Sequence, residues 1–283
     1  MVIITSYFKD ESYWLLGPQM AASLISAHTP YKCIVIVVSN EDLFDQIKKI
    51  LYDHFSSQRP VIGFSSLSGR VDLLSLAGDL KTQGAFTILA GPQAGVDFSG
   101  EDNWPQHLHR FKGYWANFSI ALQGPAEQLF PVLNAPNLEK ATEHAGVIYA
   151  TDQTIQKRPS LNWSPERLTT VDWHNLYIIK DGQLVPHPIT TAQVLQHIGC
   201  PYAARSTRIT IDFPSAIRNH TDRVATLKAC GCTFCDVAVD KGFYGSLDNN
   251  TVMAQIAGLP ENTDGRKIAF ELINEYPLPG LER

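Results

Sequence analysis

A short apolar run that ends in small polar residues decides the fold: Val61-Ile62-Gly63-Phe64-Ser65-Ser66-Leu67. An apolar run of this length, followed by serines that favour a turn, predicts a strand buried on both faces. A second run, Ile88-Leu89-Ala90-Gly91-Pro92, follows after a segment with helical periodicity. Strands that alternate with helices predict crossover units on a parallel sheet. The sequence therefore predicts an α/β fold with a doubly wound parallel sheet.

The same alternation runs through the first part of the chain. We expect strands near residues 1–7, 33–38, 60–65, 86–90 and 118–122, and helices near 16–27, 41–55, 69–83 and 126–133. Asn40 is suited to cap the second of these helices. Ligands of such sheets bind outside the carboxyl ends of the strands, so the residues that follow each strand are the first candidates for a site. They include Ser65, Ser66, Leu67, Gly91, Pro92, Gln93, Gln123, Gly124 and Pro125.

The pattern changes after about residue 140. Residues 141–190 contain Trp and Pro and one clear hairpin at 177–185, where an Asp-Gly pair favours a tight turn. We interpret this stretch as a connector between domains. A new unit, residues 191–283, contains a predicted strand at Arg208–Asp212, a helix near 249–258 and a strand near 267–273. Two domains suit 283 residues at roughly 150 residues per domain.

Composition narrows the class of protein. A hydrophobic content of 44% with 18% charged residues is ordinary for a folded globular protein. The net charge of −5 provides no basic surface of the kind that neutralises nucleic-acid phosphates. No apolar run approaches the ~20 residues that span a bilayer, and the start of the chain lacks the pattern of a signal peptide. We therefore expect a cytoplasmic protein that binds neither nucleic acid nor a membrane.

Three of the five cysteines lie close together: Cys230, Cys232 and Cys235. In a reducing compartment such spacing favours metal binding over disulfides. An iron–sulfur cluster and a structural zinc site are both compatible with three thiolates. A zinc site requires four closed ligands, and Cys200 is the candidate for the fourth.

The loops after the third, fourth and fifth predicted strands resemble those of cobalamin domains fused to radical S-adenosylmethionine enzymes. That family has a Ser-x-Leu-like turn, a Gly-Gly-Pro-like turn and a Gly-Glu-Gly-Glu-like turn in this order. The corresponding segments here are 65–67, 90–92 and 123–127, and the third matches only loosely. The resemblance implies a flavodoxin-like domain at residues 1–140 that binds cobalamin through these loops. Small residues suit this role because a corrin ring requires close approach of the backbone.

Many cobalamin proteins supply a lower axial histidine from an Asp-x-His-x-x-Gly sequence after the first strand. That sequence is missing here, and Asp172-Trp173-His174 has its first half in the connector. The lower ligand is then expected to be water, another side chain or nothing. His107 and His109 are the nearest histidines, although solvated loop residues are the simpler interpretation.

The cysteine segment is similar to the CxxxCxxC loop of radical S-adenosylmethionine enzymes. Cys232-Thr233-Phe234-Cys235 matches its last four positions, whereas Lys228 stands where the first cysteine is usual and Cys230 is the nearest thiol. Three thiolates would leave one iron of a [4Fe–4S] cluster open to S-adenosylmethionine. Further on, Ile273-Asn274-Glu275-Tyr276-Pro277-Leu278 is similar to the Gly-Gly-Glu-Pro-Leu segment, which implies that Glu275 contacts the methionine amine.

The resemblance implies a cobalamin-dependent radical S-adenosylmethionine enzyme that performs methyl transfer or a related radical reaction. Only about two strands can follow the cysteine loop, so we expect an incomplete catalytic barrel that requires a second chain or a further C-terminal domain. The alternative is a cobalamin-binding module with a structural zinc site and no catalysis of its own. The sequence contains no GxGxxG turn, phosphate loop or Gly-x-Ser-x-Gly elbow, which disfavours dinucleotide enzymes, nucleoside triphosphatases and hydrolases.

Overall fold

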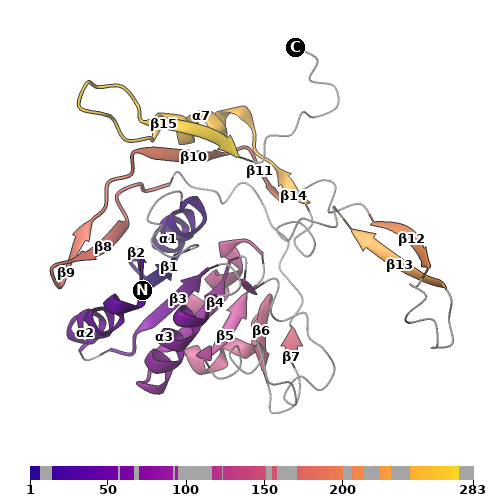
Figure 1. Ribbon diagram of the computed structural model, residues 1–283, viewed down its shortest axis with the longest axis horizontal. Helices are drawn as coiled ribbons and strands as arrows, with labels where there is room; N and C mark the ends of the chain where they lie inside the picture. Colours follow the sequence, from indigo (N-terminus) through magenta and orange to yellow (C-terminus); the bar gives the residue numbers. More distant parts are fainter. Residues whose placement is uncertain are drawn as a thin grey trace.

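A nine-stranded, mostly parallel sheet forms the centre of the structure (Figure 1). The computed structural model describes residues 1–6, 15–56, 58–66, 70–91, 93–94, 117–122, 124–150, 155–157, 171–199, 206–212, 224–230 and 243–273. None of the helices in these stretches is both long and apolar enough to cross a bilayer.

The five expected strands form the parallel part of the sheet. They are β1 (Val2–Thr5), β2 (Ile34–Val37), β3 (Val61–Ser65), β4 (Phe86–Ala90) and β5 (Ile120–Leu122). Their order across the sheet is β5-β4-β3-β1-β2. The predicted α/β class is therefore confirmed, and each strand lies where the apolar runs predict it. The chain adds β2 on one side of β1 and then β3 on the other side, so the order in which strands are added reverses between β1 and β3.

Helices cover both faces of this sheet, which explains why its strands are apolar on both sides. On one face, α1 (Leu16–His28), η3 (Ala126–Leu129) and α6 (Phe130–Leu133) pack on the odd residues of β1, such as Ile3. On the other face, α2 (Phe44–Phe55) and α3 (Val71–Thr82) pack on the even residues, such as Ile4. Burial of both sets removes water from nearly every residue of β1 to β4.

The second predicted helix begins as expected at Asn40. Its side chain accepts a hydrogen bond from the Asp42 N–H at 3.1 Å, at the start of the 3-10 turn η1 (Glu41–Leu43) that leads into α2. This bond satisfies one of the N–H groups that a helix start leaves without a partner.

Much of the expected connector belongs to the sheet. After the 3-10 turn η4 (Leu138–Glu143), β6 (Val147–Ala150) and β7 (Ile155–Lys157) extend it antiparallel beyond β5. On the opposite side, β8 (Leu176–Lys180) runs parallel to β2 and is followed by β9 (Gln183–Pro186). The predicted hairpin is confirmed, since Asp181 and Gly182 have φ values of 52° and 74°.

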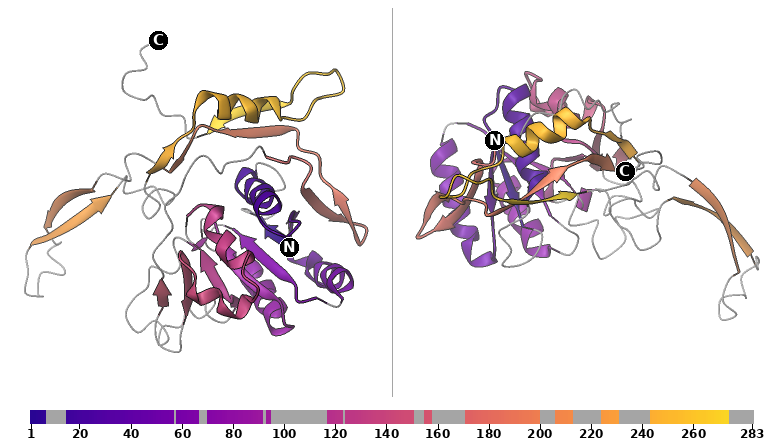
Figure 2. Two further views of the ribbon diagram at one scale, coloured as in Figure 1. Left: turned by 180° about the vertical axis from the view of Figure 1, so that it is seen from behind. Right: turned by 90° about the horizontal axis from the view of Figure 1, so that it is seen from above.

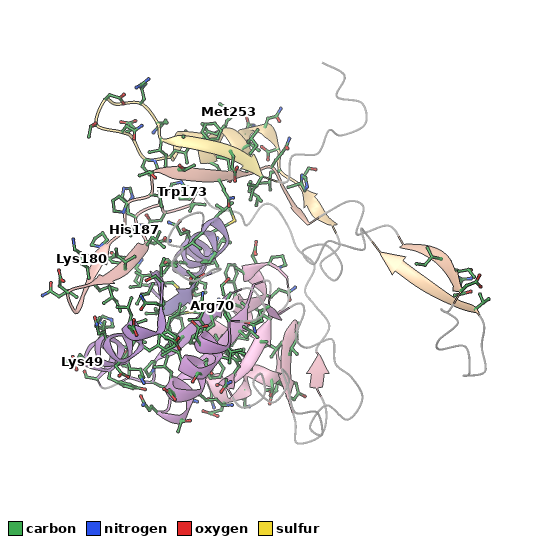
Figure 3. The ribbon with its side chains drawn as sticks, viewed as in Figure 1. Lys49, Arg70, Trp173, Lys180, His187 and Met253 are labelled. Carbon is green, nitrogen blue, oxygen red and sulfur yellow. The ribbon has the colours of Figure 1, made fainter. Side chains whose placement is uncertain are left out.

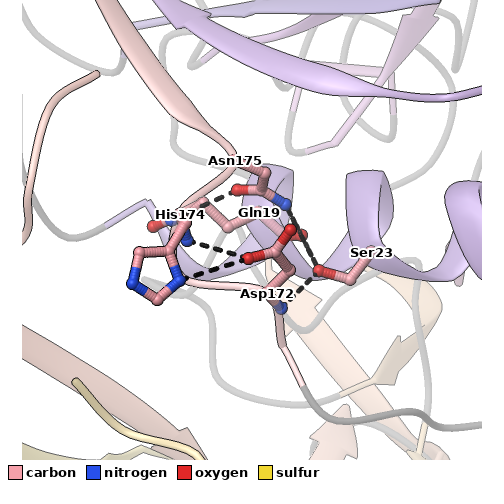
Figure 4. A network of polar contacts seen from close by, with 5 residues as sticks. All are labelled: Gln19, Ser23, Asp172, His174 and Asn175. Atoms are coloured by element: carbon pink, nitrogen blue, oxygen red, sulfur yellow. Dashed lines mark hydrogen bonds and ion pairs between the residues drawn. The ribbon is translucent and has the colours of Figure 1, made fainter.

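A buried polar network attaches this segment to α1 and explains why β8 joins β2 (Figure 4). The Asn175 side-chain amide donates to the Gln19 carbonyl at 3.0 Å, and the Asp172 N–H donates to the Ser23 hydroxyl at 2.8 Å. The Asn175 carbonyl accepts from the Val35 N–H of β2 at 2.8 Å. These bonds place the start of β8 alongside β2.

A smaller unit follows the large sheet. In it, β10 (Thr191–Leu195) pairs in parallel with β15 (Ala269–Ile273), and α7 (Asn249–Ala257) lies between them in the chain. The predicted helix and last strand are thus confirmed. Val194 and Ile268 of this unit share one buried apolar cluster with α1. Figure 1 shows α1 between the large sheet and β10.

The strand predicted at 208–212 is present. It forms β12 (Ser206–Asp212), which pairs antiparallel with β13 (Val224–Cys230) and not with β15. In the chain, β12 and β13 come after β11 (His197–Gly199) and before β14 (Phe243–Ser246). β11 and β14 also pair antiparallel with each other. Both views in Figure 2 show the β12–β13 hairpin apart from the other described strands. Several described strands precede the cysteine segment. Of these, β10 is the one that pairs with β15.

Candidate functional site

The candidate site lies at the carboxyl edge of the large sheet, where the chain changes direction between β1 and β3. Open α/β sheets bind ligands at such a switch point, because the loops that leave neighbouring strands diverge there. Ser65, Ser66, Gly91 and Gln93, all predicted site residues, lie at the ends of β3 and β4. The structure thus brings these four residues together at one edge.

Buried hydroxyl groups connect the ends of β1 and β3. The Thr5 hydroxyl donates to the Ser65 carbonyl oxygen at 2.7 Å, and the Thr5 side chain is fully buried. Ser6 and Ser65 are also buried. A buried hydroxyl with a partner holds two strand ends in register without adding charge to the site.

Ser66 and Gln93 connect the ends of β3 and β4 through a reciprocal pair of hydrogen bonds. The Ser66 hydroxyl donates to Gln93 Oε1 at 2.8 Å, and the Gln93 backbone N–H donates to the Ser66 carbonyl at 3.1 Å. Both residues are 2% exposed. Ser66 and Gln93 therefore form a buried polar pair at the strand ends, and their side chains are hydrogen-bonded to each other.

Gly91 permits the end of β4 to pack closely on Ser65 at the end of β3. Its φ of +76° lies in the left-handed region, and a Cβ atom would lie 2.5 Å from Ser65 Oγ. Only glycine fits both the backbone conformation and the space. Gly91 itself is half-buried, and Ser65 fills the space that a side chain would take.

Arg70 was not predicted as a site residue, yet its guanidinium lies at the switch point (Figure 3). It is 9% exposed, donates through Nε and Nη2 to Asp72 at 2.9 and 2.6 Å, and donates through Nη1 to the Ser6 carbonyl at 3.1 Å. The Arg70 guanidinium lowers the pKa of the Asp72 carboxyl below its ordinary value. An arginine and an aspartate two residues apart at the start of the helix predicted at 69–83 were the available sequence signal.

No protein-family model matches the chain, and no curated protein matches it at a significant score.

The end of β5 contributes backbone to the same edge. Gly124 has a φ of +101°, and Pro125 directly precedes η3. Glu127, in η3, is 6% exposed. Leu67, Pro92 and Gln123 are predicted site residues that lie outside the part of the chain that the structure describes.

The predicted metal site falls mostly outside the described residues. Cys230 is the last residue of β13, and its backbone is opposite Ser206. Cys232, Cys235, Cys200, Glu275, His107 and His109 lie in stretches that are not described. Within the described ranges, no three His, Cys, Asp or Glu side chains are grouped to hold a metal ion.

Cys33 directly precedes β2 and is a buried free thiol in the apolar cluster that also contains residues of α1. Burial raises its pKa to about 12, so the thiol is protonated near neutral pH. A thiol with so little thiolate is a poor nucleophile and a poor metal ligand. Cys33 therefore has a packing role.

A second carboxyl edge lies at the ends of β10 and β15. Gln196 follows β10, and its Oε1 atom is buried without a hydrogen-bond partner. The next residue, His197, is buried, and desolvation lowers its pKa. The imidazole is therefore neutral near pH 7. The Gln255 side chain of α7 bonds both the N–H and the carbonyl of Leu195, which closes the outer edge of β10 at that point.

Proposed function

We propose that the protein is a cobalamin-dependent radical S-adenosylmethionine enzyme, with methyl transfer or a related radical step as its reaction. In this proposal the large sheet is a flavodoxin-like cobalamin domain, and the unit of β10, α7 and β15 opens the radical domain. The observation that carries the proposal is the half-buried, left-handed Gly91, packed closely on Ser65 and next to the switch point.

The chemistry of the edge suits a corrin ring. The side chains at the ends of β3 and β4 carry hydroxyls and an amide, and Val71 at the start of α3 is 70% exposed. A corrin presents a broad apolar face with amide groups at its rim. Apolar contact and neutral hydrogen-bonding groups are what such a ligand needs.

The smaller unit supports the radical part of the proposal by its order of elements. The cysteine segment lies between β10 and α7, and Glu275 comes two residues after β15. Because β10 and β15 are parallel, the residues after each strand start from the same edge. Cys230, Cys232 and Cys235 would hold the cluster, and Glu275 would bind the methionine amine.

Cys230, Cys232 and Cys235 would hold a [4Fe–4S] cluster, which would supply an electron for the reductive cleavage of S-adenosylmethionine. The protein's own residues position the two cofactors. In this role Thr5 and Ser66 hold the strand ends in place, and Gly91 lets the end of β4 pack closely on Ser65.

Titration with hydroxocobalamin, followed by visible absorption, tests the cobalamin part. We expect micromolar binding by the natural chain, weaker binding by Gly91→Ala and unchanged binding by Gly265→Ala. Gly265 is a matched control, because its φ is +78° and a Cβ would meet nothing within 4 Å. Failure of the natural chain to bind at micromolar concentration would remove the proposal.

Metal analysis of anaerobically reconstituted protein tests the radical part. We expect about four irons per chain, and no change in Cys200→Ala, because three thiolates are enough for the cluster. Stoichiometric zinc that is lost in Cys200→Ala would instead support a binding module with a closed zinc site.

A further inference from the structure

The carboxyl end of β10 holds a side chain whose hydrogen-bonding capacity is not used. Both backbone groups of Gln196 are paired, because its N–H donates to the Ile273 carbonyl at 3.4 Å and its carbonyl accepts from the Leu247 N–H at 2.8 Å. Its Oε1 atom is buried and has no hydrogen-bond partner among the residues that the structure describes. The backbone of Gln196 is therefore fixed, and its side-chain carbonyl oxygen remains open as an acceptor.

An open acceptor of this kind costs free energy as long as no ligand is bound. A buried polar group that loses its water and gains no partner is destabilising, and such groups are rare in folded proteins. Gln196 as a whole is only half-buried, so its side chain borders solvent, where a ligand has access. A donor group bound at Oε1 would remove the cost.

Gln196 lies at the edge from which the proposed radical site extends. Its hydrogen bond to Ile273 joins the last positions of the parallel pair of β10 and β15, and Glu275 comes two residues after Ile273. The residue after Gln196, His197, is buried, and desolvation lowers the pKa of its imidazole, so the ring is neutral near pH 7. Gln196 and His197 therefore contribute polarity to this edge but no charge.

We propose that Gln196 Oε1 accepts a hydrogen bond from the adenine amine of S-adenosylmethionine. This role rests on the proposed function, which assigns S-adenosylmethionine to this edge. Of the two amines in that molecule, the ammonium of the methionine part is charged and suits a carboxylate such as Glu275. The adenine amine is neutral and donates, whereas a buried amide oxygen is neutral and accepts, so the two pair without burial of a charge.

Isothermal titration of the anaerobically reconstituted chain tests this role, with S-adenosylhomocysteine and S-inosylhomocysteine as paired ligands. The second ligand has a carbonyl oxygen in place of the adenine amine, so it would bring one acceptor against another. We expect the natural chain to bind S-adenosylhomocysteine about tenfold or more tightly than S-inosylhomocysteine. Gln196→Met keeps the length of the side chain but removes the acceptor. It should weaken the binding of S-adenosylhomocysteine about tenfold and remove most of the preference.

Gln193→Met is the matched control, because Gln193 lies on the same strand and its side-chain amide donates to Glu271 Oε1 at 2.7 Å on an exposed surface. It should leave both affinities unchanged. Urea unfolding without ligand provides a second readout. Gln196→Met should not lower the midpoint, because it removes an unpaired buried group, whereas replacement of a residue that only stabilises the fold would lower it.

Four results would overturn the role of Gln196: no binding of S-adenosylhomocysteine by the natural chain, no preference between the two ligands, equal affinities of the natural chain and Gln196→Met, or an equal loss in Gln193→Met. Metal analysis separates these results from failure of the proposed function. A chain that holds about four irons but binds S-adenosylhomocysteine independently of Gln196 contradicts the role of Gln196 alone. A chain without iron contradicts the proposed function, and the comparison of the two ligands then still decides whether Gln196 contacts adenine.

Discussion

Substitution of Gly91 by alanine tests whether the ends of β3 and β4 are packed as the structure shows. The added Cβ would meet Ser65 Oγ at 2.5 Å, Ser65 Cβ at 3.4 Å and Ser65 Cα at 3.6 Å. Only the first of these contacts is too short to exist. Ser65 is 8% exposed, so its hydroxyl has little room to move away.

The expected loss of stability has two parts. A left-handed backbone conformation costs a non-glycine residue about 1–2 kcal/mol. Crowding of a packed site typically costs about 1–3 kcal/mol more. Gly91→Ala should therefore lower the free energy of unfolding by about 2–5 kcal/mol. Gly265→Ala should lower it by about 1–2 kcal/mol, because only the backbone part applies there.

Urea unfolding, followed by circular dichroism, measures both variants. The double variant Ser65→Ala/Gly91→Ala should recover about 1 kcal/mol or more relative to the sum of the single variants, because it removes the clashing oxygen. Similar losses in Gly91→Ala and Gly265→Ala, together with no recovery in the double variant, would refute the packing that we describe.

Three further predictions concern the rest of the chain. Gln255→Leu should lower the free energy of unfolding by about 1–3 kcal/mol, because it leaves the Leu195 N–H and carbonyl unpaired. Gln193→Leu, which removes an exposed hydrogen bond to Glu271, should lower it less, and denaturant titration measures both variants. Since Arg70 lowers the pKa of Asp72, the stability from this pair should be present above about pH 4 and decline as pH falls below it, and Asp72→Asn should remove that part of the pH dependence in acid titrations. The exposed strand Ala269–Ile273, with Phe270 and Leu272 about 40% exposed, should favour association of chains in sedimentation experiments, and Phe270→Lys/Leu272→Lys should weaken it; a monomer at all concentrations would contradict this expectation.

Local patterns were enough to predict β1 to β5 of the large sheet and the helices between them. Runs such as Val61–Ser65 are apolar on both faces, and that pattern is decided by neighbours in the sequence. The pairing of β8 with β2 was not predictable in this way. It joins residues far apart in the chain, and it depends on the bonds of Asn175 to Gln19 and Val35. Nothing near Asn175 in the sequence indicates these partners.

The candidate site shows the same division. Ser66, Gly91 and Gln93 were predicted because small or polar residues after an apolar run mark a strand end. Arg70 and Asp72 were missed because an arginine and an aspartate two residues apart also describe an ordinary exposed turn, as Asp264 and Arg266 do. Burial distinguishes the two pairs, and burial depends on tertiary packing.

The composition of α1 agrees with the way in which the two units pack together, although the sequence analysis did not predict that packing. Residues 16–28 contain no Lys, Arg, Asp or Glu, whereas α2 has four charged residues on its open face among 44–55. A helix without a charged face is covered on more than one side. In the structure the large sheet lies on one side of α1 and β10 on the other, and all three contribute to one apolar cluster (Figure 1). The smaller unit is therefore not a separate module on a connector. A ligand at either carboxyl edge binds a unit that is packed against α1, so α1 is the physical link between the two proposed cofactor sites.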